Sequence, residues 1–319
     1  MQLFEFLPEG TLINTTKNAE RLNSTDAILH TIENELIVEG EAILCDSDHN
    51  LVVDFGNFRG IIPHRDTAIG IDSGRTREIA VISRVGKPVS CIINGIDTSG
   101  TENILKLSRV EAQKKALAHF FNNVSPGDIL PARITHLEQF GAFADIGCGN
   151  ISLLGIEALS VSRISHPGDR FNIGDDISVV VSALDSDQFR VSLSHRELLG
   201  TWEENASNFK PGQTVRGIVR GVENYGIFVE LTPNLSGLAE FNQNVNIGDC
   251  VSVFIKSIIP EKMKIKLIII DILPEKTRRL IKSSDYYIKS GHIDEWHYSP
   301  HFCLKKEIST IFKNNDPPV

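Results

Sequence analysis

The chain has 319 residues, more than one hydrophobic core usually organises, so two or three domains are expected. Hydrophobic residues make up 41% and charged residues 23% of the chain, values typical of a globular protein rather than of a disordered or membrane class. The net charge of −9 argues against a general DNA-coating protein, because proteins that neutralise many phosphates usually carry a basic excess.

Charge is distributed unevenly along the chain. Residues 1–209 contain 17 Lys and Arg against 29 Asp and Glu, whereas residues 210–319 contain 15 against 12. We therefore expect the positive potential to lie in the last third of the chain.

The N-terminal stretch MQLFEFLPEGTLINTTKN lacks a basic segment followed by an apolar core, and no window of about 18 apolar residues occurs, so neither secretion nor membrane spanning is expected. The five cysteines are scattered and form no C-x-x-C pair, which fits a reducing cytosol. The sequence thus predicts a cytoplasmic protein without a membrane partner.

In chain order, residues 1–36 are expected to form an N-terminal extension of mixed character. Residues 37–108 predict a first, divergent barrel, with strands in LIVEGEAILCD, NLVVDFG, RGIIPHRD, REIAVISRVGKPVSCIING and NILKLSR. Apolar residues at helical spacing predict a helical linker over 109–124.

The next two segments form an internal repeat. PGDILPARITHLEQFGAFADIGCG at 126–149 aligns without a gap on PGQTVRGIVRGVENYGIFVELTPN at 211–234, an offset of 85 residues that also brings Asp145 onto Glu230. Each copy continues into NIGDDISVVVSAL or NIGDCVSVFIKSI and a last strand, FRVSLS or MKIKLII. These patterns predict barrels at 125–197 and 210–272, a helical linker at 198–209, and a basic and aromatic C-terminal extension at 273–319.

About five strands in some 70 residues is the size of an OB barrel. We therefore expect an all-β fold: a tandem array of three five-stranded OB-fold barrels with short helical linkers and α or irregular terminal extensions.

At this point the sequence resembles a known family. The run I-x-x-L-x-x-F-G-A-F-A-D-I-G, then SRISHPGDRFNIGDDISV and FRVSLS, is similar to the RNA-binding repeat of the bacterial small-subunit ribosomal protein S1, and LLGTWEENASNFKPGQTV resembles that family's linkers. GHIDEWHYSP at 291–300 resembles a tail of a clostridial-type short form. The resemblance covers roughly 125–270 well, 37–108 less well, and the first 36 residues not at all.

Two aromatic pairs are the main candidates for RNA stacking, because single-stranded bases stack on exposed rings. Phe140 and Phe143 match Tyr225 and Phe228 in the repeat. Residues three apart on a regular strand point to opposite faces, so we expect Gly141 to allow a bulge or sharp bend that turns both rings outward. The alternative is that one ring of each pair belongs to the core. Residues 37–108 lack such a pair.

The resemblance implies further RNA-binding positions. Arg190 opens the RVSLS strand and matches the family's Arg, and Asp185 matches its Asp when one extra loop residue is allowed. The family's His is absent, since Gly155 and Glu240 occupy its place, and His166 in the SHPG turn is a candidate to replace it.

Lysines supply the candidate phosphate contacts of the third barrel. Lys264 stands where Arg190 stands, and Lys256, Lys262 and Lys266 add positive charge. A solvated surface strand is the alternative interpretation.

No catalytic centre or cofactor is expected. The sequence has no P-loop, G-x-S-x-G or H-E-x-x-H motif. His292, His297, His301 and Cys303 are zinc-type ligands, but their spacing matches no closed tetrahedral signature, so no metal site is predicted there.

These patterns predict a non-enzymatic protein that binds single-stranded RNA, mRNA in particular, in association with the small ribosomal subunit and translation, without a small-molecule substrate. The alternative is a protein adaptor that docks on ribosomes or an RNA-processing assembly, with RNA contact limited to the third barrel. In either case the first barrel, with GIIPHRD at 60–66, is expected to contact protein more than RNA.

Overall fold

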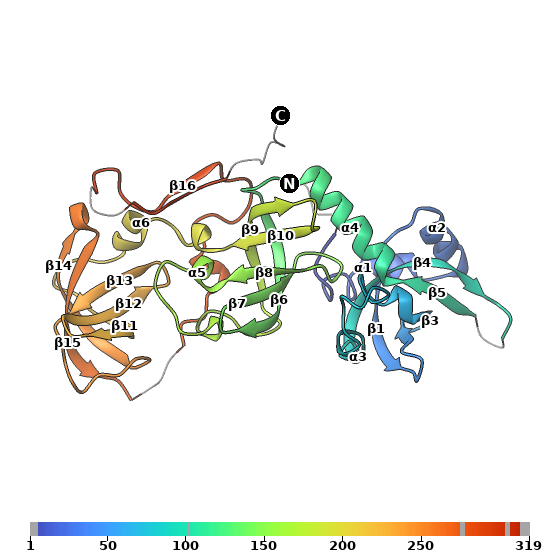
Figure 1. Cartoon of the computed structure of the whole chain (residues 1–319), viewed down its shortest axis with the longest axis horizontal. Helices are drawn as coiled ribbons and strands as arrows, with labels where there is room; N and C mark the ends of the chain where they lie inside the picture. The colour runs from blue at the N-terminus through green and yellow to red at the C-terminus, as the bar shows by residue number, and fades with distance from the viewer. Residues whose placement is uncertain (1–5, 101–102, 275–277, 304–306, 313–319) are drawn as a thin grey trace. The chain divides into compact units, whose positions relative to one another are not determined.

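A computed structural model describes residues 6–100, 103–274, 278–303 and 307–312 of the chain. Its main feature is three closed five-stranded barrels, which can be followed in Figure 1, and this confirms the predicted tandem OB-type fold. The chain divides into two compact units, which are described separately. The N-terminal unit comprises Met1–Val124, Pro131–Arg133 and Asp145–Ile151; the C-terminal unit comprises Ser125–Leu130, Ile134–Ala144 and Ser152–Val319.

The three barrels share one strand order, in which the third strand pairs with the fifth in parallel. The first consists of β1 (Val38–Cys45), β2 (Leu51–Asp54), β3 (Arg59–Ile62), β4 (Lys87–Asp97) and β5 (Ile104–Ser108). The second consists of β6 (Ile129–Glu138), β7 (Gly141–Asp145), β8 (Ile151–Gly155), β9 (Asp176–Asp185) and β10 (Arg190–Ser194). The third consists of β11 (Thr214–Glu223), β12 (Gly226–Thr232), β13 (Leu235–Ala239), β14 (Cys250–Ile259) and β15 (Lys264–Ile272).

Helices and short turns connect these strands. The α-helices are α1 (Thr16–Arg21), α2 (Thr25–Glu33), α3 (Ile79–Ile82), α4 (Arg109–Asn123), α5 (Ile156–Leu159) and α6 (Trp202–Ala206). The 3-10 turns are η1 (His64–Asp66), η2 (Pro167–Asp169), η3 (Arg196–Leu199), η4 (Pro260–Lys262) and η5 (Ser283–Asp285). A two-stranded sheet pairs β16 (Glu295–His297) with β17 (Ser309–Ile311).

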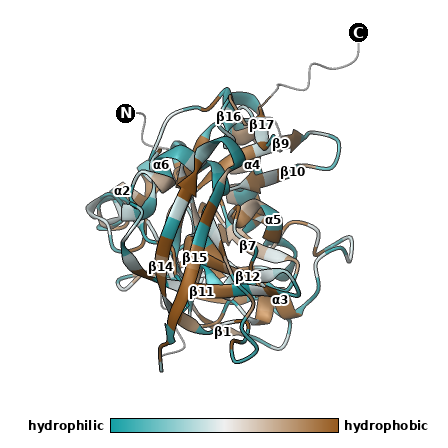
Figure 2. Cartoon of the chain, turned by 90° about the vertical axis from the view of Figure 1, so that its left-hand side faces the viewer, coloured by the Kyte–Doolittle hydropathy of each residue, from teal (hydrophilic) through white to brown (hydrophobic). Residues whose placement is uncertain are grey.

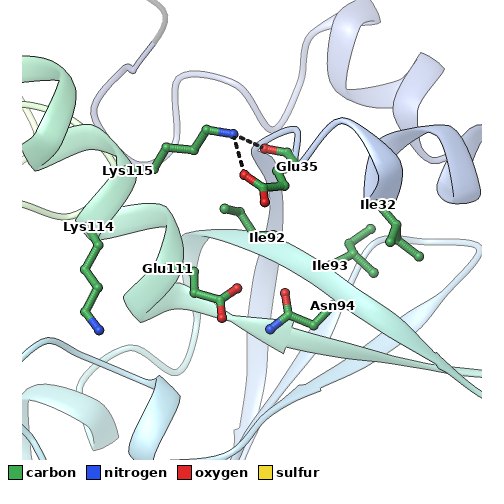
Figure 3. A pocket seen from close by; sticks show the side chains of 8 residues that line it. All are labelled: Ile32, Glu35, Ile92, Ile93, Asn94, Glu111, Lys114 and Lys115. Carbon is green, nitrogen blue, oxygen red and sulfur yellow. Dashed lines mark hydrogen bonds and ion pairs between the residues drawn. The ribbon is translucent and has the colours of Figure 1, made fainter.

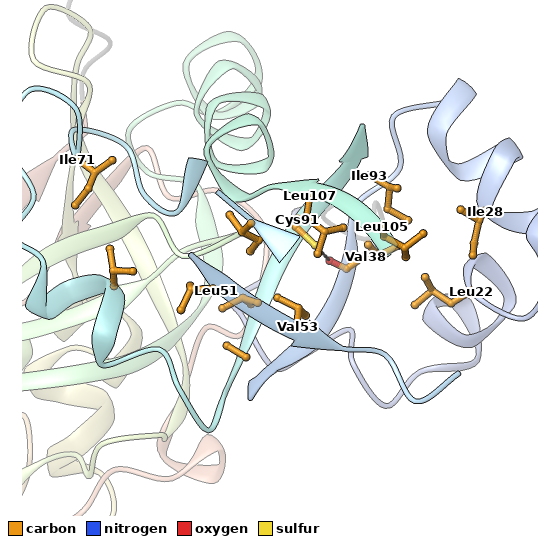
Figure 4. Close-up of a cluster of buried hydrophobic side chains, with 14 residues drawn as sticks. Leu22, Ile28, Val38, Leu51, Val53, Ile71, Cys91, Ile93, Leu105 and Leu107 are labelled. Carbon is orange, nitrogen blue, oxygen red and sulfur yellow. Dashed lines mark hydrogen bonds between the residues drawn. The ribbon is translucent and has the colours of Figure 1, made fainter. Parts of the chain in front are cut away.

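Two residues of the described segment 6–36 belong to the first barrel's core. Leu22 and Ile28, on the helical part of this segment, pack in the same buried cluster as Val38, Ile93 and Leu105 of the barrel, as Figure 4 shows. Burial of apolar side chains is the main favourable term in folding, so these helices stabilise the barrel that follows them.

A buried ion pair fixes the start of this segment. The carboxylate of Glu9 accepts hydrogen bonds from Arg109 Nε at 2.7 Å and Nη2 at 3.0 Å, and from Arg84 Nη1 at 3.0 Å. Burial raises the pKa of Glu9, but the charges of Arg109 and Arg84 outweigh it, so its pKa lies below the ordinary value. The backbone N–H of Glu9 donates to Asp145 Oδ2 at 2.7 Å, in the turn that belongs to the same unit.

In the C-terminal unit, the second and third barrels are joined by a polar network. Arg170 and Glu230 are both fully buried, and Arg170 donates to Glu230 through Nη1 at 3.0 Å and Nη2 at 2.8 Å. Arg220 donates to the same carboxylate through Nε at 2.7 Å and pairs with Asp169 at 3.2 Å. Two guanidinium groups therefore compensate one buried carboxylate.

The C-terminal segment packs against both barrels of this unit. Tyr286 Oη lies 3.0 Å from His195 Nε2, while His195 Nδ1 lies 3.1 Å from the Leu159 carbonyl oxygen. Because a carbonyl only accepts, Nδ1 carries the proton and Tyr286 donates to Nε2. Tyr298 is buried and its hydroxyl donates to the Asn234 carbonyl of the third barrel.

Side-chain burial alternates at the start of strand β15, as expected for a barrel strand with one face toward the core. Ile265 and Leu267 point into the core, while Lys264 and Lys266 are exposed. Farther along, Ile270 is 60% exposed, and in Figure 2 brown hydrophobic stretches are visible on β14 and β15.

Among the described residues, no helix is both long and apolar enough to cross a membrane.

Candidate nucleic-acid interface

The two predicted aromatic pairs have nearly the same geometry. The rings of Tyr225 and Phe228 lie 6.1 Å apart, centroid to centroid, at an interplanar angle of 87°; those of Phe140 and Phe143 lie 5.9 Å apart at 89°. Tyr225 is 70% and Phe140 56% exposed, and neither Phe143 nor Phe228 is buried. Both pairs therefore present stacking surfaces to solvent instead of filling a core.

A sharp turn immediately before each glycine, at residues 139–140 and 224–225, carries the first ring of each pair outward. Tyr225 lies in the two-residue turn between Glu223 and Gly226, which face each other across β11 and β12. A Cβ on Gly226 would lie 2.5 Å from the Ala239 carbonyl oxygen, and one on Gly141 would lie 2.5 Å from the Leu154 carbonyl oxygen. The glycines are thus required for close approach to the neighbouring strand, and a sharp turn at residues 139–140 precedes Gly141, where a bulge or sharp bend is expected.

Strand register places Phe228 in a continuous row on the outside of the third barrel. Phe228 faces Gly221 on one side and Leu238 on the other, and Leu238 in turn faces Lys266. Phe228 and Lys266 are exposed and Leu238 is half-buried. This row combines a ring, an aliphatic surface and a cation on one face, and we call it the aromatic row.

A hollow of about 730 Å³ adjoins the aromatic row. Tyr225, Phe228, Lys262 and Lys264 line it on the barrel side, and Arg220 also lines it. Within the described part of the chain, Arg220 Nη2 is buried without a hydrogen-bond partner. Because Arg220 already pairs with Glu230 and Asp169, its charge is compensated within the protein, and Lys262 and Lys264 are the exposed cations of the hollow.

Two of the four predicted lysines therefore share a hollow with both rings, and a third lies on the aromatic row. Lys256 is also exposed, but it lies where the β14–β15 register shifts between Ile255 and Ser257 and does not line the hollow. Arg220 and Leu238 were absent from the predicted site. Leu238 lies in the repeat, whereas nothing in the local sequence marks Arg220 as a ligand-facing residue.

The candidate RNA-binding residues of the second barrel are more widely separated than those of the third barrel. Arg190 and Asp185 are exposed and face each other across β9 and β10. Ser192 faces Leu153, as Lys266 faces Leu238 in the third barrel, so a neutral side chain replaces the lysine. His166 Nδ1 accepts a hydrogen bond at 3.0 Å from the Gly168 N–H and caps η2, which gives this ring a local structural partner.

The same register row in the first barrel is aliphatic. Leu44 faces Val52, Val52 faces Ile61, and Ile61 faces Lys106, with Leu44 53% and Ile61 39% exposed. The rings of Phe55 and Phe58 instead pack against the barrel core. We call this the aliphatic row; it offers a hydrophobic surface without a ring for base stacking.

A second hollow, of about 520 Å³, lies beside α4 and β4 in the N-terminal unit (Figure 3). Its polar lining includes Glu111, Lys114 and Lys115, and Lys115 donates to the Glu35 carbonyl at 2.8 Å. Its described lining includes no aromatic side chain, so it lacks the feature that distinguishes the aromatic row.

The four C-terminal metal-type ligands do not converge. His292 pairs with Asp128 at 2.7 Å, His297 lies 3.4 Å from Glu295, and His301 packs against the Phe302 ring. Cys303 is buried, and none of the four belongs to a ligand cluster among the described residues.

Comparison with known proteins identifies the repeat. Residues 123–196 match the sequence model of the S1 RNA binding domain. The small ribosomal subunit protein bS1 homolog of Bacillus subtilis is 30% identical over 273 residues, covering 83% of this chain and 67% of that protein. The bS1 protein of Leuconostoc lactis is 30% identical over 232 residues, covering 68% of this chain and 52% of that protein.

Among solved structures, a multidomain protein with nucleic acid binding domains from Streptococcus pneumoniae aligns over 74% of both chains, with 13% identity and a TM-score of 0.25. The present chain spans between about half and two thirds of the length of the two curated relatives. The matched repeat, the barrels and the extent of the bS1 similarity lead to one conclusion: the chain belongs to the family of the bacterial small ribosomal subunit protein bS1.

Proposed function

We propose that this protein binds single-stranded RNA, mRNA in particular, in association with the small ribosomal subunit during translation. The observation that carries the proposal is the duplicated aromatic pair, exposed and perpendicular in both the second and the third barrel. Base stacking on an exposed ring contributes about 1 to 3 kcal/mol per base and tolerates any base. No catalytic step and no cofactor form part of this function.

The third barrel is the stronger of the two RNA-binding faces. Its hollow holds two rings together with Lys262 and Lys264. Bases stack on the rings while phosphates meet the cations, which is how single strands are held without sequence readout. The second barrel offers the same rings with Arg190 but with Ser192 in place of the third barrel's lysine.

Fluorescence anisotropy with a labelled single-stranded RNA tests this function in the full chain. Tyr225→Ala with Phe228→Ala should lose about 1 to 3 kcal/mol per base contact, and Phe140→Ala with Phe143→Ala should lose a smaller part. The matched control is Leu44→Ala with Ile61→Ala, on the aliphatic row, which should leave RNA affinity unchanged. Equal affinity of the wild type and both aromatic variants, with circular dichroism unchanged, would refute the proposal.

The aliphatic row supports a second role, in which the first barrel contacts protein rather than RNA. A row of exposed Leu44, half-buried Val52 and exposed Ile61 favours apolar protein contact over nucleotide stacking. The small ribosomal subunit is the partner that fits a bS1-family protein, and a cytoplasmic location follows from that partnership.

Sedimentation of a tagged full chain with purified small subunits tests this role. Leu44→Asp with Ile61→Asp should abolish co-sedimentation while free-RNA affinity stays at the wild-type value. If instead the aromatic variants lose co-sedimentation and the aspartate variant keeps it, the subunit is bound through RNA alone.

A further inference from the structure

Three side chains of metal-ligand type converge at one end of the first barrel, away from both aromatic pairs in sequence. His49 Nδ1 lies 3.1 Å and His64 Nε2 2.9 Å from the same oxygen, Oε2 of Glu78. The three ligand atoms all lie within 4.8 Å of one another. The two imidazoles thus point a nitrogen at one carboxylate oxygen.

Each of the three residues comes from a different element. His49 lies in the turn between β1 and β2, His64 begins η1 after β3, and Glu78 immediately precedes α3. They are 15 and 14 residues apart in sequence, which hides the cluster from a motif search. The barrel topology, not local sequence, brings them together.

The backbone around the cluster is tied down. Asp46 Oδ1 accepts hydrogen bonds from the Asp48 and Asn50 N–H groups at 2.9 and 2.8 Å, which fixes the turn. Within that turn His49 adopts φ = 61°, a left-handed conformation uncommon for a residue other than glycine. Asn50 Oδ1 then accepts the His64 N–H at 2.9 Å, so the turn and η1 are linked directly.

We propose that His49, His64 and Glu78 form a binding site for a divalent transition metal, with Zn²⁺ as the best-suited ion. Two imidazole nitrogens and one carboxylate oxygen are an established zinc ligand set. With metal–ligand bonds of about 2.0 to 2.2 Å, tetrahedral geometry separates ligand atoms by about 3.3 to 3.6 Å. The two His–Glu separations of 2.9 and 3.1 Å are close to this range, and the two imidazole nitrogens lie within 4.8 Å of each other.

The site leaves a coordination position for water or for a ligand from a partner. The side chains of His49, His64 and Glu78 are 38%, 35% and 47% exposed. Asp46, in the same turn, adds negative charge close to His49. A bound cation would fasten the β1–β2 turn to the η1–α3 segment.

Two other histidines pair with carboxylates and can be compared with this cluster. His136 lies 2.7 Å from Glu138 on the second barrel and is 58% exposed, and no third ligand joins this pair among the described residues. His292 faces Asp128 and Asp294 without a second imidazole. One imidazole beside one or two carboxylates is an ordinary surface ion pair. Two imidazoles beside one carboxylate provide three ligands that can hold one metal ion together.

The test uses the full chain, stripped with a chelator and titrated with Zn²⁺ by calorimetry, with bound metal counted by mass spectrometry. One Zn²⁺ per chain is expected. Removing a ligand by His49→Gln, His64→Gln or Glu78→Gln should weaken binding by about 100-fold or more, at least as much as the loss of an outer-shell partner. His136→Gln is the matched control and should bind as the wild type does.

Co²⁺ substitution gives a readout of the ligands themselves. The wild type should show the visible absorption of four-coordinate Co²⁺, and Glu78→Gln should lose it while its circular dichroism stays native. A variant with His292→Gln, His297→Gln and His301→Gln should keep both the stoichiometry and the spectrum. Zinc binding lost in that C-terminal variant but retained in Glu78→Gln, or no stoichiometric zinc in the wild type, would overturn the proposal.

Discussion

Arg170 and Glu230 form a two-pronged ion pair from which solvent is fully excluded. Arg170 follows β8 of the second barrel, and Glu230 lies on β12 of the third. Arg170 also donates through Nε to Ser160 Oγ at 3.0 Å, so its guanidinium is held from two directions. The two barrels of the C-terminal unit are thereby joined through one carboxylate.

Breaking this pair should destabilise the C-terminal unit strongly. Glu230→Gln leaves Arg170 and Arg220 without their shared counter-charge, and removing one partner of a buried pair costs about 3 to 5 kcal/mol. Urea denaturation followed by tryptophan fluorescence measures the loss. Asp97→Asn, which removes an exposed pair with Lys106, should leave the midpoint unchanged. A small effect of Glu230→Gln would mean that water solvates Arg170 and Arg220 after the substitution and that the buried pair contributes little to stability.

Gly226 should not accept a side chain. Gly226→Ala would place Cβ 2.5 Å from the Ala239 carbonyl at φ = 152°, and we expect a loss of about 1 to 3 kcal/mol in stability together with weaker RNA binding, because the Tyr225 turn must shift. Gly95→Ala is the matched control, since no atom lies within 4 Å of its Cβ position. Melting curves and RNA anisotropy on both variants distinguish strain from a general intolerance of alanine.

The third-barrel lysines should set the salt dependence of RNA binding. For single strands the slope of log affinity against log salt changes by about 0.7 per phosphate contact, so Lys262→Gln, Lys264→Gln and Lys266→Gln together should flatten it by about two. Base selectivity should hardly change. The charge-matched control replaces exposed Lys17, Lys87 and Lys114 by Gln and should keep the wild-type slope. A wild-type slope in the first variant would mean that these lysines only solvate β15.

Acid should destabilise the C-terminal unit through His195. Burial lowers the pKa of His195 to about 4, from an ordinary value of 6.5, so as pH falls below 6.5 the unfolded chain takes up the proton first. Stability is therefore lost between about pH 6.5 and 4, by about 3 kcal/mol from this group. His195→Gln should flatten the fall in urea midpoint over that range, whereas exposed His136→Gln should not. Parallel pH profiles of wild type and His195→Gln would contradict this assignment.

The sequence repeat predicted the parts of the fold that rest on local patterns. The alignment of Phe140 with Tyr225 and of Phe143 with Phe228 anticipated two equivalent ring pairs, because strand alternation and turn glycines are written in neighbouring residues. The five-stranded barrels followed from the same periodicity.

Long-range polar contacts could not be predicted in this way. Arg170 and Glu230 are 60 residues apart, and nothing near either marks it as buried. The same holds for Arg220, whose partner Asp169 precedes the third barrel, and for Glu9, whose partners come from several separate elements. The segment 1–36 was expected to be an extension, yet Leu22 and Ile28 are core residues, because amphipathic helices do not state which surface they cover.

Asp145 and Glu230 occupy the same place in the repeat, but their carboxylates bind different partners. Asp145 accepts the backbone N–H of Glu9, and Glu230 takes the guanidinium of Arg170. Within each unit, therefore, a barrel carboxylate binds a residue that lies outside its own barrel. A fragment cut at 210 would expose the third barrel's carboxylate without its counter-ion from the preceding barrel, and a fragment ending at 120 would lack the turn that receives Glu9. The barrels of this protein depend on residues outside their own strands. Their individual affinities for RNA are therefore best measured by point substitution within the intact chain.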